Sequence, residues 1–159
     1  MIKTVIVSDD VSVSKQLAEQ LNVLFGEKVS FVEVTLQGDL IGKIKEINPE
    51  ILLTINLAGF DRTTLTDNIA YNLLDCKQLH VICDENLRNE KELEKLLSIA
   101  MFFACSKKEM REVLKIKYPH IPWITDMEGW SCSEGLCAEK NVAEIARMIE
   151  VVIKECRLG

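Results

Sequence analysis

Short runs of apolar residues, separated by longer amphipathic stretches, form the main pattern of this sequence. The first run, Ile2–Val7, is rich in β-branched residues and apolar on both faces, as a central parallel strand is. Residues 29–34 instead alternate apolar with polar positions, which predicts a more exposed strand near the edge of the sheet. Further runs predict strands over residues 51–57, 79–83, 99–104 and 121–125.

The stretches between these runs predict helices, because their apolar residues recur three and four positions apart. Asp9, Asp10 or Ser12 can cap the first helix, and Gly26 ends it. The apolar positions of this helix are Leu17, Leu21, Leu24 and Phe25. Later helices are predicted over residues 36–47, 64–74, 89–97, 106–118 and 142–153.

Strands that alternate with helices are typical of a doubly wound α/β fold, a three-layer sandwich around a mostly parallel sheet. We expect one flavodoxin-like or Rossmann-like domain over residues 1–159, with five or six strands. The exposed second strand and the buried first and third strands favour the flavodoxin-like order 2-1-3-4-5. The predicted core includes Val5, Ile6, Leu52, Leu53, Ile82 and Phe102.

Composition and charge exclude several classes of function. The net charge is −6 and basic residues are interleaved with acidic ones, so no electropositive face for a nucleic acid is expected. No apolar stretch reaches the roughly 20 residues of a membrane span, and the N-terminus lacks a signal-like cationic region. We therefore expect a cytoplasmic protein that binds neither nucleic acid nor membrane.

The six cysteines of such a chain are expected to be reduced thiols. Cys132 and Cys137 form a C-x4-C pair, but a structural zinc site would need a second pair of ligands. His80 and His120 lie in no catalytic motif, which favours structural roles for both.

Fingerprint motifs of nucleotide binding and of serine hydrolases are absent. Neither G-x-G-x-x-G nor G-x-x-x-x-G-K-[ST] occurs, and no G-x-S-x-G elbow is present. The turn after the first strand, Ser8-Asp9-Asp10, would repel a pyrophosphate. No nucleotide cofactor is therefore expected.

Polar residues follow the predicted strands, and the carboxyl ends of parallel strands share one edge where ligands bind. Asn56 and Ser106, the latter opening a capping box, would hydrogen-bond a polar ligand, and Phe60 could stack on a sugar ring. Weak magnesium or calcium binding is predicted at Asp9 and Asp10, with helix capping as the alternative. The other expected ligand-binding residues are Ser8, Gly59, Asp61 and Asp84.

The Asp9-Asp10 pair and the segment PEILLTINLAGFD (49–61) resemble response-regulator receiver domains, in which acidic residues hold a divalent cation. Thr54 and Asn56 stand where the phosphoacceptor aspartate of that family is expected. Cys83 replaces the usual Ser or Thr, and Lys107 or Lys108 could take the place of the receiver lysine. The resemblance implies a receiver-like signalling module that cannot accept a phosphoryl group.

Residues 48–61, 79–87, 99–115 and 120–125 also resemble the N-terminal half of spore-maturation-type glycosyltransferases of GT-B architecture. This resemblance implies the acceptor-side half, without the domain that binds the nucleotide-sugar. The sequence therefore predicts a non-catalytic binding or regulatory domain for a polar or sugar-containing ligand, or for a protein partner. The alternatives are a half-enzyme completed by a partner chain, and the receiver-like module.

Overall fold

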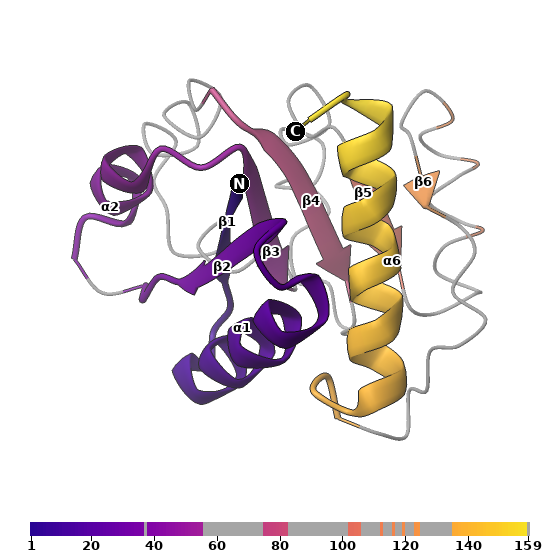
Figure 1. Cartoon of the computed structure of the whole chain (residues 1–159), viewed down its shortest axis with the longest axis horizontal. Coiled ribbons are helices and arrows are strands. Elements are labelled where there is room, and N and C mark those ends of the chain that lie inside the picture. The colour runs from indigo at the N-terminus through magenta and orange to yellow at the C-terminus, as the bar shows by residue number, and fades with distance from the viewer. Residues whose placement is uncertain are drawn as a thin grey trace.

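The strands form a single parallel sheet in the computed structural model, which describes residues 1–36, 38–55, 75–82, 102–105, 112, 116, 119, 123–124 and 135–158. In this part of the chain the sheet has six strands in the order β2-β1-β3-β4-β5-β6 (Figure 1). The strands are β1 (Ile2–Val7), β2 (Val29–Glu33), β3 (Ile51–Ile55), β4 (Lys77–Ile82), β5 (Phe102–Cys105) and β6 (Trp123–Ile124).

The parallel α/β fold and its flavodoxin-like strand order confirm the prediction from the sequence. β1 lies between β2 and β3, so that Val5 pairs with Val32 on one side and Leu52 on the other. β4 begins at Lys77, two residues before the predicted start, and β5 extends to Cys105, one residue beyond its predicted end. Residues 56 and 57, predicted to continue β3, lie outside the described part of the chain.

Three helices are described: α1 (Val11–Phe25), α2 (Leu40–Ile47) and α6 (Glu139–Glu155). α1 ends at Gly26, as predicted, because this glycine adopts a left-handed φ of 58°. α2 begins at Leu40 rather than at Leu36, since the Asp39 side chain accepts a hydrogen bond from Gly42 N and caps the helix there. None of these helices is long and apolar enough to cross a membrane.

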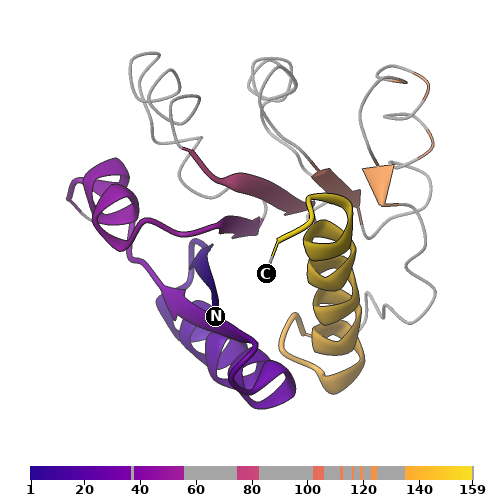
Figure 2. The same ribbon diagram turned by 45° about the horizontal axis from the view of Figure 1, so that its top comes forward.

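α1 and α6 pack on the same face of the sheet, where they bury the main hydrophobic cluster (Figure 2). α6 contributes the five positions that the sequence predicted for one face of this helix, all of them buried. Leu24, also predicted to face inward, is 59% exposed because it lies at the flank of α1 rather than over the sheet. The buried α6 positions are Val142, Ile145, Ile149, Val152 and Ile153.

The predicted core is confirmed at β1 and β3. Val5, Ile6, Leu52 and Leu53 have no exposed surface, as expected for strands covered on both faces. β2 is an edge strand, and Val32 on it is 40% exposed, which agrees with its alternating sequence. The burial of Ile82 and Phe102 lies outside what the structure describes.

Candidate functional site

The carboxyl edge of the sheet carries the predicted site. The turn after β1, Ser8-Asp9-Asp10, lies at this edge and leads directly into α1. Val7 pairs with Thr54 of β3, so the turn adjoins the end of the neighbouring strand. Six predicted ligand-binding residues lie outside the described part of the chain: Asn56, Gly59, Phe60, Asp61, Asp84 and Ser106. Their roles stay predictions.

Hydrogen bonds within the turn engage the hydroxyl group of Ser8. Ser8 is 6% exposed, and its Oγ donates to the backbone oxygen of Asp10 over 2.8 Å. Ser8 Oγ also contacts Ser14 Oγ, which in turn donates to Asp10 O over 3.3 Å. These hydrogen bonds hold the Ser8-Asp9-Asp10 segment against the start of α1. Ser8 therefore has a structural role, and the ligand contact predicted for it stays a prediction.

Asp10 caps α1, which confirms the capping interpretation for this residue. Its Oδ1 accepts from Ser12 N (3.0 Å), Ser12 Oγ (2.7 Å) and Val13 N (3.4 Å). The hydrogen bond from the Ser12 side chain, followed by those from Val13 and Ser12 backbone N–H groups, lowers the pKa of the Asp10 carboxyl. All three hydrogen bonds go to the same carboxylate oxygen of Asp10. The predicted metal contact of Asp9 and Asp10 stays a prediction.

Among the described residues, no group of three or more His, Cys, Asp or Glu side chains is arranged to hold a metal ion. A hard divalent cation takes six or more oxygen ligands, of which a protein usually supplies several. Asp61 and Asp84, the other carboxylates predicted at this edge, lie outside the described part of the chain.

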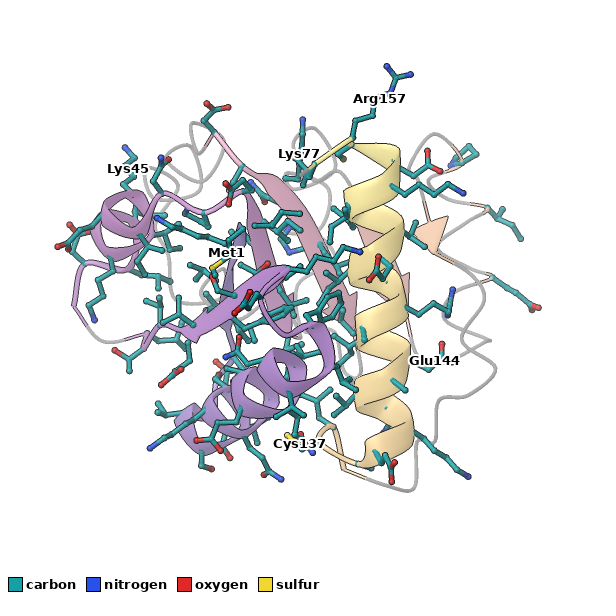
Figure 3. The ribbon with its side chains drawn as sticks, in the orientation of Figure 1. Met1, Lys45, Lys77, Cys137, Glu144 and Arg157 are labelled. Atoms are coloured by element: carbon teal, nitrogen blue, oxygen red, sulfur yellow. The ribbon has the colours of Figure 1, made fainter. Side chains whose placement is uncertain are left out.

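The loop before α6 closes over the flank of α1 near this turn. Gln20 Nε2 donates to Cys137 O over 2.9 Å, and Cys137 Sγ donates to Val13 O over 3.6 Å. Figure 3 shows Cys137 at the start of α6, beside α1. Burial, and secondly the negative charge of Asp10, raise the pKa of the Cys137 thiol, so it stays protonated. Cys137 is a free cysteine in the structure, and Cys132 lies outside the described residues, so the absence of metal binding by this pair stays a prediction.

A row of buried polar side chains crosses the two central strands β3 and β4. Thr54 and His80 pair directly across the strands, and Gln78 precedes His80 by two residues, which puts it on the same face. Each of the three is at most 1% exposed. Thr54 Oγ1 lies 2.5 Å from His80 Nδ1, and His80 Nε2 lies 3.1 Å from Gln78 Oε1.

These contacts define the tautomer of His80. The amide oxygen of Gln78 can only accept, so Nε2 of the ring carries the proton and donates to it. Nδ1 then accepts the hydroxyl proton of Thr54. Burial lowers the pKa of His80 to about 3, so the ring is neutral at physiological pH. The structural role predicted for His80 is confirmed.

Sequence reasoning missed Gln78 and its place in this row. The signal was present, since polar residues at 78 and 80 alternate with apolar residues at 79 and 81. On a strand covered on both faces, such alternation indicates a polar row inside the protein rather than a solvated face. Thr54 completes the row from the neighbouring strand.

The side chains of β3 limit the reactions that are possible at the carboxyl edge of the sheet. Its five residues are Ile, Leu, Leu, Thr and Ile, none of which is a carboxylate that could accept a phosphoryl group. The one hydroxyl group, on Thr54, is buried and hydrogen-bonded to a neutral imidazole. β3 itself therefore offers no free nucleophile at this edge.

Comparisons with known proteins give only distant likenesses. No model of a known protein family matches the chain, and no well-characterised protein has a matching sequence. A solved LuxR-family DNA-binding response regulator from Staphylococcus aureus is 17% identical with a TM-score of 0.46, over 72% of this chain and 94% of that one. A pilus assembly-related protein from Burkholderia pseudomallei is 16% identical with a TM-score of 0.45, over 79% and 95% of the two chains.

Proposed function

We propose that this chain is a receiver-like α/β domain that cannot be phosphorylated and that acts through non-covalent binding to a partner. The observation that carries the proposal is the end of β3. There Thr54, a buried residue without a carboxylate, is hydrogen-bonded to the neutral His80. The end of β3 thus carries a buried, hydrogen-bonded hydroxyl group instead of a reactive carboxylate.

The strand order supports the receiver-like part of the proposal. Receiver and flavodoxin-like domains share the order 2-1-3-4-5, in which the first strand lies between the second and third. The same order is present here, with β6 added beside β5. The turn with Asp9 and Asp10 consequently adjoins the carboxyl end of β3, as the acidic turn of a receiver domain would.

The acidic turn supports the non-catalytic part. Asp10 is engaged in capping α1, and the hydrogen bonds of Ser8 and Ser14 hold the turn in place. A receiver that transfers phosphate needs a cation next to its phosphoacceptor, because the metal neutralises the charge that develops. The described part of the chain offers neither a phosphoacceptor on β3 nor a cluster of metal ligands.

The ligand that fits such a domain is a protein surface or a small polar molecule at the carboxyl edge. Asn56, Gly59, Phe60, Asp61, Asp84 and Ser106 are the residues proposed to meet it, together with the Ser8-Asp9-Asp10 turn. The glycosyltransferase interpretation has no comparable support among the described residues. Thermal unfolding with a panel of sugar-containing acceptor molecules separates the two, since an acceptor-binding half-enzyme would be stabilised and a receiver-like module would not.

Phosphorylation is the direct test. The purified chain is incubated with an acyl phosphate and magnesium, and its intact mass is compared with that of an active receiver domain treated in parallel. We expect the active receiver to gain one phosphoryl group and this chain to gain none. A phosphorylated product that depends on Asp9 or Asp10 would contradict the proposal.

A further inference from the structure

β2 is the outer strand of the sheet, and its hydrogen bonds show which of its backbone groups face outward. Ile2 N donates to Lys28 O over 3.1 Å, and Val34 N donates to Ile6 O over 3.1 Å. Alternate residues of a parallel strand bond to the same neighbour, so the even-numbered residues of β2 face β1. Val29, Phe31 and Glu33 therefore turn their N–H and C=O groups toward the open edge.

Asn22 of α1 occupies the middle of that edge. Its Nδ2 donates to Phe31 O over 3.0 Å, and its Oδ1 accepts from Phe31 N over 2.8 Å. A side-chain amide has one donor side and one acceptor, as a peptide group has, so Asn22 bonds Phe31 as a residue of an added strand would. On either side of Asn22, α1 packs against the sheet: Leu21 is fully buried, and the ring centroid of Phe25 is 5.2 Å from that of Phe31.

Without Asn22, this edge has the properties of a strand that pairs with a copy of itself. Its sequence, Val-Ser-Phe-Val-Glu, is rich in β-formers, and Phe31 is its central residue. In an antiparallel pair of two β2 strands centred on Phe31, the two Phe31 residues would exchange the same two hydrogen bonds that Asn22 now supplies. Glu33 would lie opposite Val29, so no like charges would oppose the pairing.

We propose that Asn22 blocks the β2 edge and thereby prevents the sheet from extending into a second copy of this chain. Open strand edges are templates for such pairing, and proteins commonly cover or disrupt them. Here the block is one amide at the central position of a five-residue strand. A consequence for the proposed binding role is that a partner engages the carboxyl edge or the helices, and not β2, while Asn22 is in place.

The test measures the molar mass of the full chain in solution by light scattering over a range of concentrations. Asn22→Ala removes both hydrogen bonds, and Gln16→Ala, at an exposed position of α1, is the matched control. We expect wild type and Gln16→Ala to remain monomeric, and Asn22→Ala to shift toward the dimer mass as concentration rises. A folded Asn22→Ala variant with the same mass as wild type at every concentration overturns the proposal.

Two further measurements keep the proposal testable if Asn22→Ala fails to fold. Asn22→Asp retains an acceptor for Phe31 N and places a negative charge at the edge, so we expect it to stay monomeric. In the wild type, the Phe31 amide should exchange with solvent deuterium more slowly than the Glu33 amide, which also faces outward. Equally fast exchange at the two positions would show that Asn22 does not cover the edge, and the proposal would be wrong.

Discussion

Thr54 on β3 and His80 on β4 face each other across the centre of the sheet, joined by a hydrogen bond from Thr54 Oγ1 to His80 Nδ1. Gln78 extends the contact along β4 by accepting from His80 Nε2. Two hydrogen bonds thus link the three buried side chains, in keeping with the rule that buried polar groups need partners. This arrangement is the observation on which the proposed function rests.

Thr54→Val should destabilise the protein. Valine has nearly the shape of threonine but cannot donate to His80 Nδ1, which is left buried without this donor. Loss of one partner from a buried polar pair costs about 1–3 kcal/mol of the free energy of unfolding. Chemical denaturation of wild type and variant measures this difference. Equal stabilities would show that the Thr54–His80 contact is not formed in solution.

Thr4→Val is the same substitution two strands away from His80, and it should stabilise the protein. Thr4 is fully buried on β1, and its Oγ1 has no hydrogen-bond partner. Removing an unpaired buried hydroxyl relieves a desolvation penalty, so the variant should gain about 1 kcal/mol of stability. For a chain of this length that corresponds to a melting temperature about 2–4 °C higher. A lower melting temperature would indicate that Thr4 has a partner in solution.

The stability of the protein should depend on pH through His80. The pKa of His80 is lowered from 6.5 to about 3 in the folded state, so between these values the unfolded chain binds a proton that the folded chain does not. The free energy of unfolding should therefore rise with pH across this window, by up to about 1.4 kcal/mol per unit, and level off above it. Denaturation between about pH 4.5 and 8, which covers the upper part of this window, measures the slope in the wild type. His80→Gln should show a shallower slope; an unchanged slope would assign the dependence to other groups.

Two substitutions of Asp10 distinguish helix capping from metal binding at this residue. Asp10→Ala should lower the melting temperature because Ser12 N and Val13 N lose their acceptor, whereas Asp10→Asn should retain the cap and most of the stability. The predicted weak magnesium or calcium site would add stability in millimolar metal to the wild type and not to Asp10→Asn. Melting temperatures that metal leaves unchanged in both proteins would assign Asp10 to capping alone.

The sequence predicted the fold well because its information is local and repeated. Apolar runs such as Ile2–Val7 and 51–55 carry the signal of buried parallel strands at most of their positions. The exposed face of β2 likewise predicted its place at the edge, and Gly26 predicted the end of α1. These features depend on a residue and its near neighbours, which a sequence displays directly.

The site was less predictable because its contacts join residues that are distant in sequence. Thr54 and His80 meet only through the pairing of β3 with β4, and Asn22 reaches Phe31 only because α1 folds back over β2. Asp10 was a candidate both for capping and for metal binding, since each role uses an aspartate at the end of a strand. The hydrogen bonds from Ser12 and Val13 establish the capping role, which residue type alone does not show, and the metal role stays a prediction.

The most direct test of the central claim is the nitrogen spectrum of the His80 ring, recorded by NMR with and without an acyl phosphate and magnesium. We expect a neutral ring with the proton on Nε2, which does not titrate near neutral pH and does not change when the phosphate donor is added. A protonated ring at neutral pH would contradict the buried Thr54–His80–Gln78 row. A phosphorylation-dependent change at His80, accompanied by the mass of a phosphoryl adduct, would contradict the proposal that this receiver-like domain works without phosphotransfer.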